Sequence, residues 1–389
     1  MRRRPRLAAV LALVSALCWG HGPAWARQAA PEVRLGLVAT FSGEGFRAGR
    51  DALEAARFAV EAANAAGVPT VDGKPCRVTL FPLDDKDSPE QAARAVRDLA
   101  AHKHVTAIIG PYPSGLANAA ALAADALGVP LVAPAATAAV VTAGRPHVFR
   151  IPFTDAFQGL VIGRLASREL GLSRVAVVAN RDSLSSTSLA RAFVEAFTAC
   201  GGAAGLFTYA DRDRDFGPLM AKVLAENPQA LFFPNATKES ILLALAARKA
   251  GFSGTLLGGD AWDGREVSGL AAFDGAYFVD HWREGSPGER SRAYVAAFKQ
   301  ARKRAPTEIG ALTQDAVDVV LAAVARAGST DREAVTRALI ELPPHDGVTG
   351  TFDFVDDGNP IKSLCVTRAT DGGTRQESRV LPPPEPCGK

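Results

Sequence analysis

Hydroxyl side chains follow two apolar segments of the chain, at places where each segment gives way to a helix-like pattern. Ser114 comes after the apolar residues 105–109, and Thr137 comes after the apolar residues 129–132. The first N–H groups of a helix lack partners and carry a partial positive charge, so a carboxylate or another small anion can bind there. Either residue alone could be an ordinary helix cap. Because ligands of open α/β sheets bind beyond the carboxyl ends of strands, the pair favours an anion site.

An acidic residue stands in a comparable place later in the chain. Asp260 is the first acid after the expected strand at residues 255–258, with Gly259 before it and Trp262 two residues after it. A carboxylate in such a loop suits an ammonium group. The alternative is a loop aspartate that binds its own backbone, and position alone leaves both interpretations open.

Apolar strands that alternate with amphipathic helices predict the elements that position these residues. The period is typical of doubly wound parallel sheets in two domains, with extended crossovers at residues 147–155 and 280–282. The expected strands cover residues 33–40, 76–83, 105–109, 129–132, 174–179, 204–209, 230–234, 255–258 and 275–279, and a C-terminal hairpin covers 349–368. The expected helices cover residues 49–66, 90–101, 156–170, 188–199, 216–226, 239–250, 288–304, 309–327 and 331–342.

The N-terminus has the pattern of a secretory signal peptide. Four arginines precede the apolar residues 7–17, and Ala24-Trp25-Ala26 provides a cleavage site, so we expect residues 1–26 to be removed on export to the periplasm. A lipoprotein anchored through Cys18 is the second interpretation, although Leu17 is large for that processing. The leader takes away four of the 44 basic residues and none of the 41 acidic ones, which leaves a formal charge of −1. Nucleic acid is therefore not an expected partner, and stable membrane insertion is not expected.

Three glycines near the start of the first helix are the only sign of an enzyme. Gly43, Gly45 and Gly49 follow a strand and precede a helix, which is a weak dinucleotide-binding pattern. A glycine-rich turn beside a ligand cleft explains them as well, and no Ser-His-Asp arrangement, C-x-x-C pair or metal-ligand spacing is legible. We expect no catalytic residues, no metal site and no cofactor; an exported dinucleotide-binding enzyme is the less favoured alternative.

Together these residues resemble those of the type I periplasmic solute-binding proteins of branched-chain amino acid (Leu/Ile/Val) ABC transporters. The resemblance covers about residues 33–368. Its motifs are Ser42-Gly43 after the opening strand, Asp84-Asp85 before a helix, IIGPYPSG at 108–115, Ala133-Pro134-Ala135-Ala136-Thr137, Phe149-Arg150, and TGTFDF at 349–354.

The resemblance implies an α/β fold of two doubly wound, Rossmann-like lobes joined by a three-crossing hinge. Residues 27–152 with 283–347 would form lobe 1, and residues 153–282 with 348–389 would form lobe 2. It further implies that Ser114 and Thr137 bind a ligand carboxylate, helped by the backbone around Ala135, and that Asp260 pairs with an ammonium group. The expected protein is a monomer that delivers a small amino-acid-like or carboxylate ligand to an ABC permease; a sensing module for a receptor is the alternative.

Several ligand-wall positions depart from the family pattern. Phe46 stands near the place of an aromatic residue in the glycine-rich loop, whereas Ser185 and Ala236-Thr237 stand where the family often has tyrosines. The anchors for the charged groups of an amino acid are thus present without the usual walls, so the ligand's identity stays open.

The four cysteines of the expected mature chain allow disulfides in an oxidising compartment. Cys365 and Cys387 bracket the C-terminal tail and are the preferred bridge. Cys76 and Cys200 fall in different lobes, so we expect no bridge between them.

Overall fold

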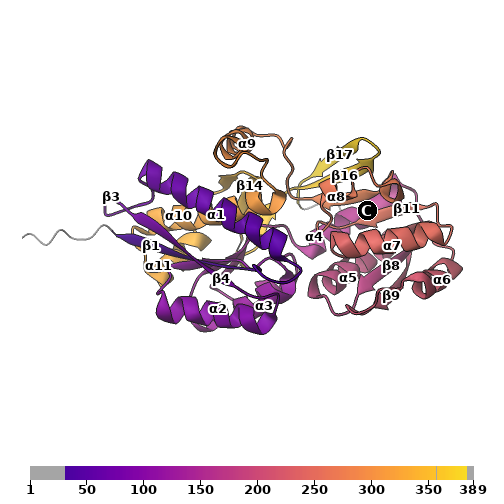
Figure 1. Ribbon diagram of the computed structural model, residues 1–389, viewed down its shortest axis with the longest axis horizontal. Coiled ribbons are helices and arrows are strands. Elements are labelled where there is room, and N and C mark those ends of the chain that lie inside the picture. The colour runs from indigo at the N-terminus through magenta and orange to yellow at the C-terminus, as the bar shows by residue number, and fades with distance from the viewer. Residues whose placement is uncertain (1–30, 356, 383–389) are drawn as a thin grey trace, which may run out of the picture. The chain divides into compact units, whose positions relative to one another are not determined.

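The computed structural model describes residues 31–355 and 357–382, which form two α/β lobes (Figure 1). The expected signal peptide, Cys18 and Cys387 lie outside the described residues. Over the described ranges, no helix is both long enough and apolar enough for a membrane crossing.

The first lobe is a sheet of five parallel strands with helices on both faces. The strands, in spatial order, are β4 (Arg77–Asp84), β1 (Glu32–Ala39), β5 (Ala107–Ile109), β6 (Leu131–Ala133) and β7 (Val148–Arg150). Side chains alternate along β1, so Leu35 and Leu37 enter one core while Val38 enters the other. The first core is closed by α1 (Phe46–Ala66), α10 (Glu308–Ala327) and α11 (Arg332–Ile340), and the second by α2 (Pro89–His102) and α3 (Ser114–Ala126).

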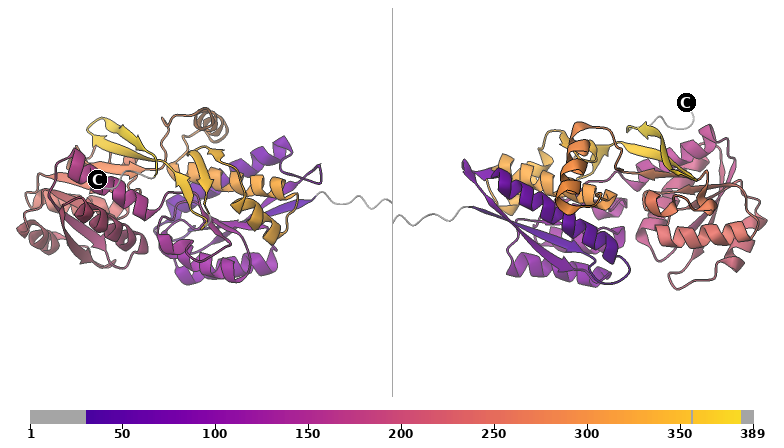
Figure 2. Two further views of the ribbon diagram at one scale, coloured as in Figure 1. Left: turned by 180° about the vertical axis from the view of Figure 1, so that it is seen from behind. Right: turned by 45° about the horizontal axis from the view of Figure 1, so that its top comes forward.

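The second lobe repeats this arrangement and adds two antiparallel strands at one edge. Its sheet runs in the order β17 (Gly373–Val380), β16 (Leu364–Thr370), β12 (Tyr277–Asp280), β11 (Thr255–Gly258), β10 (Ala230–Phe233), β8 (Arg174–Asn180) and β9 (Ala203–Tyr209). Figure 2 shows the yellow strands β16 and β17 side by side at this edge. One face packs against α4 (Asp155–Arg164) and α5 (Leu184–Ala199), and the other packs against α6 (Gly217–Ala225) and α7 (Thr237–Lys249).

Both lobes have the strand order of a doubly wound sheet, in which the first strand lies inside the sheet. β1 lies between β4 and β5, and β8 lies between β9 and β10. The predicted fold class is therefore confirmed. The ends of the central strands form the topological switch points where α/β proteins bind ligands.

The C-terminal part of the first lobe is more elaborate than the sequence suggests. A small sheet of β13 (His345–Gly347), β14 (Gly350–Phe354) and β15 (Pro360–Lys362) follows α11. Phe352 and Phe354 of β14 belong to the core of the first lobe, and the chain joins the second sheet only at β16. These contacts differ from the expected lobe boundary after residue 347. The hydrophobic alternation of β14 predicts a strand but does not tell which core it faces.

The preferred disulfide is wrong, because Cys365 carries a free thiol. Cys365 lies within β16, opposite Asp280 of β12 and Arg379 of β17, and only 4% of it is exposed. Burial raises the pKa of this thiol to about 11. Cys76 is also free and buried, so the expectation that it does not pair with Cys200 is confirmed. Cys200 is disulfide-bonded, and neither of the other two described cysteines is its partner.

Candidate functional site

Ser114 lies at the start of α3 but is not its cap. Pro113 holds the N-cap position and has no side-chain oxygen, so the first-turn N–H groups are left for other partners. The Ser114 N–H donates to Ser185 Oγ at 3.3 Å, and Ser114 Oγ accepts from the Ala138 N–H at 3.3 Å. Ser114 thus touches both the segment that contains Thr137 and, at Ser185, the second lobe.

The segment around Thr137 does not begin a second α-helix, contrary to the predicted repeat. It enters a short 3-10 helix at Ala139–Val141, and a buried arginine binds carbonyl groups of this segment. Arg150, which is fully buried, donates to Ala136 O at 2.8 Å and to Ala138 O at 3.0 Å. Burial lowers the pKa of Arg150 to about 10, so the guanidinium stays charged at neutral pH. Thr137 itself is buried, and its carbonyl accepts from the Asp155 N–H at 3.0 Å.

Two side chains fix the Asp260 carboxylate. Gln158 of α4 donates from Nε2 to Asp260 Oδ1 at 2.9 Å and accepts from the Asp260 N–H at 2.7 Å. His281 places Nε2 at 3.1 Å from Asp260 Oδ2, while its ring stacks on Phe153 with 3.9 Å between the ring centroids. Burial lowers the pKa of His281, which favours the neutral ring. The Asp260 carboxylate is therefore fixed by side chains of other segments, unlike a loop aspartate that binds its own backbone.

Asp155, the first residue of α4, was missed by sequence reasoning. It is only 3% exposed, and neither carboxyl oxygen has a hydrogen-bond donor among the described residues. Burial, then the neighbouring Asp260 carboxylate, raises the pKa of Asp155 to about 7. The sequence gives no signal for this, because an acid after Thr154 at a helix start reads as a favourable first-turn charge, and Thr154 does cap α4.

The remaining predicted residues divide into two groups. Ser185 reaches the first lobe, as described, and the half-buried Ala135 has a backbone that no hydrogen bond between described residues uses. Phe46 begins α1, is 40% exposed and lines an outer hollow. Ser114 contacts Ser185 and Ala138, the residue after Thr137, and Thr137 contacts Asp155 of α4, the helix whose Gln158 binds Asp260. Phe46 makes none of these contacts.

The glycine-rich turn and the paired acids before α2 support each other. Asp84 accepts from the Phe41 N–H at 2.8 Å and from Ser42 Oγ at 2.6 Å, and Asp85 accepts from Thr40 Oγ1 at 2.7 Å. A Cβ on Gly49 would lie 1.8 Å from Thr40 O, so only glycine allows this approach of helix to strand. The motif therefore has a structural explanation in strand and helix packing.

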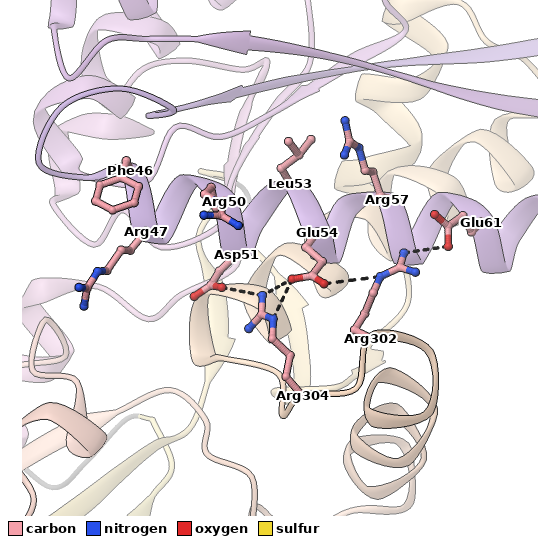
Figure 3. Close-up of a pocket in the computed structure, with 10 residues that line it drawn as sticks. All are labelled: Phe46, Arg47, Arg50, Asp51, Leu53, Glu54, Arg57, Glu61, Arg302 and Arg304. Atoms are coloured by element: carbon pink, nitrogen blue, oxygen red, sulfur yellow. Dashed lines mark hydrogen bonds and ion pairs between the residues drawn. The ribbon is translucent and has the colours of Figure 1, made fainter.

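Two hollows at the surface lie apart from the anchors. The larger, about 620 Å³, follows the outer side of α1, where Asp51, Glu54 and Glu61 pair with Arg302 and Arg304 (Figure 3). Arg47, Arg50 and Arg57 line the same hollow and take no part in the ion pairs drawn there. The second, about 320 Å³, is lined by residues of both lobes: Glu44, Asp87, Tyr209, Asp211, Asp213, Arg214, Phe216, Lys238, Glu239 and Leu242.

Comparisons with known proteins agree with this fold. Residues 32–374 match the family model described as periplasmic binding protein. The Leu/Ile/Val-binding protein homolog 3 of Brucella melitensis is 26% identical over 361 residues, which are 90% of this chain and 94% of the relative. A leucine binding protein of Thermotoga maritima has a similar structure, with a TM-score of 0.84, 30% identity, and coverage of 90% of this chain and 99% of that one. The branched-chain amino acid transporter substrate binding protein of Streptococcus pneumoniae, solved with isoleucine, gives a TM-score of 0.80 at 25% identity, covering 90% and 99%.

Proposed function

Because the chain belongs to the periplasmic binding protein family, we propose that it is the substrate-binding protein of an ABC importer and captures a small amino-acid-like or carboxylate ligand between its lobes. One observation carries the proposal. Ser114 contacts Ala138 next to Thr137, the Thr137 carbonyl accepts from the N–H of Asp155 in α4, and Gln158 of the same helix binds the Asp260 carboxylate. Family members of this kind bind solutes without chemical conversion, which agrees with the expectation that the chain is not an enzyme.

The first-lobe side of the site suits a carboxylate. The N-terminus of α3, which has 13 residues, supplies backbone N–H groups and partial positive charge around Ser114. The Thr137 hydroxyl and the unused backbone of Ala135 lie on the next loop. Buried Arg150, behind that loop, keeps the loop in place and adds positive charge.

The second-lobe side suits an ammonium group. Asp260 is 14% exposed at its side chain, and Gln158 and His281 fix its orientation. An ionised acid whose rotamer is already fixed loses little conformational freedom on binding a cation. Donors on one lobe and acids on the other therefore match the two ends of an amino acid.

The cellular setting completes the proposal. A signal peptide at residues 1–26 would deliver the protein to the periplasm, and an ABC permease would receive the ligand. N-terminal mass spectrometry of the exported protein tests the first point, with a mature start near Arg27 expected. An intact N-terminus or a lipid on Cys18 would contradict it.

Binding measurements on three variants test the site. Ser114→Ala and Thr137→Ala should each weaken binding roughly tenfold to a hundredfold, since a hydrogen bond to a charged group contributes about 1.5–3 kcal/mol. Asp260→Ala should weaken binding of an amino acid more, because the buried ammonium loses its counter-charge. The ligand comes from a thermal-shift screen of amino acids, amides and small carboxylates, and titration calorimetry gives the affinities.

Exposed residues of the same types serve as controls. Thr70→Ala in the first lobe and Asp274→Ala in the second remove similar groups at exposed positions and should leave affinity unchanged. If Ser114→Ala, Thr137→Ala and Asp260→Ala all bind like the unmutated protein, the proposed site is wrong. If only Asp260→Ala is silent, the ligand is a carboxylate without an amine.

A further inference from the structure

The second hollow, of about 320 Å³, combines an excess of acidic side chains with a buried tyrosine hydroxyl. Five carboxylates and two cations line it, which leaves a formal excess of three negative charges. Tyr209, at the end of β9, also lines the hollow; it is only 3% exposed, and its hydroxyl has no hydrogen-bond partner among the described residues. Buried polar atoms in proteins are nearly always paired, so this hydroxyl indicates a partner that a ligand would supply.

One buried amide orients two of the carboxylates. Asn180, the last residue of β8, is 1% exposed and donates from Nδ2 both to Glu239 Oε1, at 3.1 Å, and to Asp211 Oδ1. The Asn180 N–H donates to Ser186 Oγ at 2.9 Å, which fixes the backbone at this point. Because both carboxylates bind the same nitrogen, the two acceptor oxygens lie no more than about 6 Å apart. A carboxylate accepts through two oxygens, so each can take a further N–H donor.

The two cations of the hollow do not neutralise this pair of acids. Lys238 pairs with Glu44 of the first lobe at 3.2 Å. Arg214 donates to two main-chain carbonyl groups of its own loop. Among the residues that the structure describes, no ion pair within 4.0 Å joins a basic side chain to Asp211 or Glu239. The hollow therefore offers negative charge that the protein itself leaves without a counter-ion.

We propose that this hollow binds the cationic end of the ligand's side chain, so the substrate class is that of amino acids with a guanidinium or a second primary ammonium group. The inference rests on the proposed function. A guanidinium has five N–H donors and an ammonium group has three, enough for the oxygens of Asp211, Glu239 and Tyr209 together. Over residues 31–355 and 357–382, no cluster of three or more His, Cys, Asp or Glu side chains could hold a metal ion, which favours an organic cation.

The hollow lies within reach of Asp260, the proposed anchor for the other ammonium group. Only β10 separates β8 from β11, so the ends of these two strands lie about 10 Å apart. An extended lysine or arginine side chain with a hydrogen bond of about 3 Å at each end covers such a distance. The start of α7 connects the two places, since Thr237 donates from Oγ1 to Ala261 O at 2.9 Å and Glu239 follows in the same helical turn.

A purely structural role explains these groups less well. Two neighbouring carboxylates disfavour each other's ionisation, and a buried hydroxyl without a partner is destabilising. Phenylalanine at position 209 would fill the same space without that penalty. Burial, then the Glu239 and Asp211 carboxylates, raises the pKa of Tyr209, so its hydroxyl stays neutral and its oxygen can accept. A cationic N–H donor would remove both penalties.

Matched ligand pairs test the substrate class. Arginine is compared with citrulline, and lysine with norleucine; each pair shares both α-groups and differs in charge at the end of the side chain. We expect the cationic member of at least one pair to bind at least tenfold tighter in titration calorimetry. A preference below tenfold in both pairs would overturn the inference and, if any amino acid or small carboxylate binds, leave the proposed function intact. If no compound of the screen binds, both fail.

Substitutions test the hollow itself. Glu239→Gln and Asp211→Asn keep the shapes and remove the charges, and each should weaken binding of the cationic ligand roughly tenfold to a hundredfold. Tyr209→Phe should weaken it roughly threefold to tenfold. Glu226→Gln, at an exposed position of the same lobe, is the matched control and should change nothing.

The same variants decide against the inference if the hollow is not a binding site. Circular dichroism checks that each variant folds, and Asp211→Asn, at an exposed position, is the variant to use if Glu239→Gln does not. If Ser114→Ala weakens binding of the cationic ligand but the folded variants of Glu239, Asp211 and Tyr209 bind it like the unmutated protein, the hollow has no part in ligand binding and the inference fails.

Discussion

At the scale of single residues, the proposed site depends on how each charged group is held. His281 is an example, because it touches Asp260 with Nε2 and stacks on Phe153, while its N–H donates to Glu308. Its Nδ1 atom is buried without a partner among the described residues. The His281 ring therefore joins the proposed ammonium anchor to Phe153 in the first crossover, and the His281 backbone N–H joins the second crossover to the first residue of α10.

Ligand affinity should rise with pH through neutrality. Burial and the Asp260 carboxylate raise the pKa of Asp155 to about 7, so this group is mostly protonated at pH 6 and mostly ionised at pH 8. A cationic ligand prefers the ionised form, so binding should tighten over this range and release a proton. Titration calorimetry in buffers of different ionisation enthalpy measures both effects, and Asp155→Asn should flatten the profile. An affinity of the unmutated protein that does not change with pH would show that ionisation of Asp155 has no effect on ligand binding.

The same residue should lower the stability of the empty protein. Its folded pKa of about 7 lies above the ordinary value of 3.8, so between these values the folded state holds a proton that the unfolded state has lost. Stability contributed by this group therefore falls as pH rises from about 4 to 7, by up to roughly 4 kcal/mol. Asp155→Asn should then stabilise the unliganded protein more at pH 8 than at pH 5 in urea unfolding. If the substitution changed stability equally at both pH values, the pKa of Asp155 would not be raised in the folded protein.

At the scale of elements, the lobes depend on close contacts between helices and strands. α1 crosses β1 where Gly49 faces the Thr40 carbonyl, and Gly110 passes the Val38 carbonyl in a backbone conformation with φ of 92°. These two glycines set the positions of the loops that carry the glycine-rich turn and Ser114. The packing of helices against strands thus determines where the residues of the proposed site lie.

Gly49→Ala should destabilise the first lobe. The added Cβ would lie 1.8 Å from Thr40 O, so helix and strand must separate, which costs about 1–3 kcal/mol. Gly115→Ala is a matched control in the first turn of α3, where a Cβ meets nothing within 4 Å. That change should be neutral or stabilising by up to about 1 kcal/mol. Thermal unfolding of both variants decides, and equal melting temperatures would refute the packing argument.

Most helices and strands could be predicted from the sequence, because buried parallel strands are apolar throughout and the helices have a clear stripe of apolar residues along one face. The failures have local physical causes. Ala139–Val141 form a 3-10 helix in place of the expected α-helix, and the sequence pattern does not show that Arg150 binds carbonyls of this segment. Cys365 is unpaired because it lies inside the second sheet, and Asp155 was missed because burial and neighbours, not residue type, make it unusual.

At the scale of the whole molecule, polar contacts connect the two lobes at the surface as well as at the site. Lys238 pairs with Glu44 at 3.2 Å, and Arg47 approaches Glu266 at 3.9 Å. All four side chains are largely exposed. Exposed ion pairs contribute little free energy. We therefore expect the buried groups to contribute most of the free energy of the contact between the lobes, and the surface pairs to change it only slightly.

Removal of a surface pair should therefore have a small effect. Lys238→Met should change ligand affinity by less than about fivefold, and the difference should shrink in high salt because exposed charges are screened. Calorimetry at low and high sodium chloride measures this, with Asp260→Ala as the contrasting variant. A loss of affinity of more than tenfold that persists in high salt would mean that the surface ion pair makes a major contribution to closure of the lobes.

Each lobe has one free cysteine among the residues that the structure describes, so labelling of these thiols can follow the unfolding of each lobe. Cys76 belongs to the core of the first lobe and Cys365 to the second sheet, and burial raises the pKa of both thiols. Only the thiolate reacts with an alkylating reagent, so each cysteine is protected until its surroundings open. The order in which the two sulfurs are labelled would then report whether the lobes unfold together or one before the other. Saturating ligand should slow the labelling of the cysteine in any lobe that the ligand stabilises.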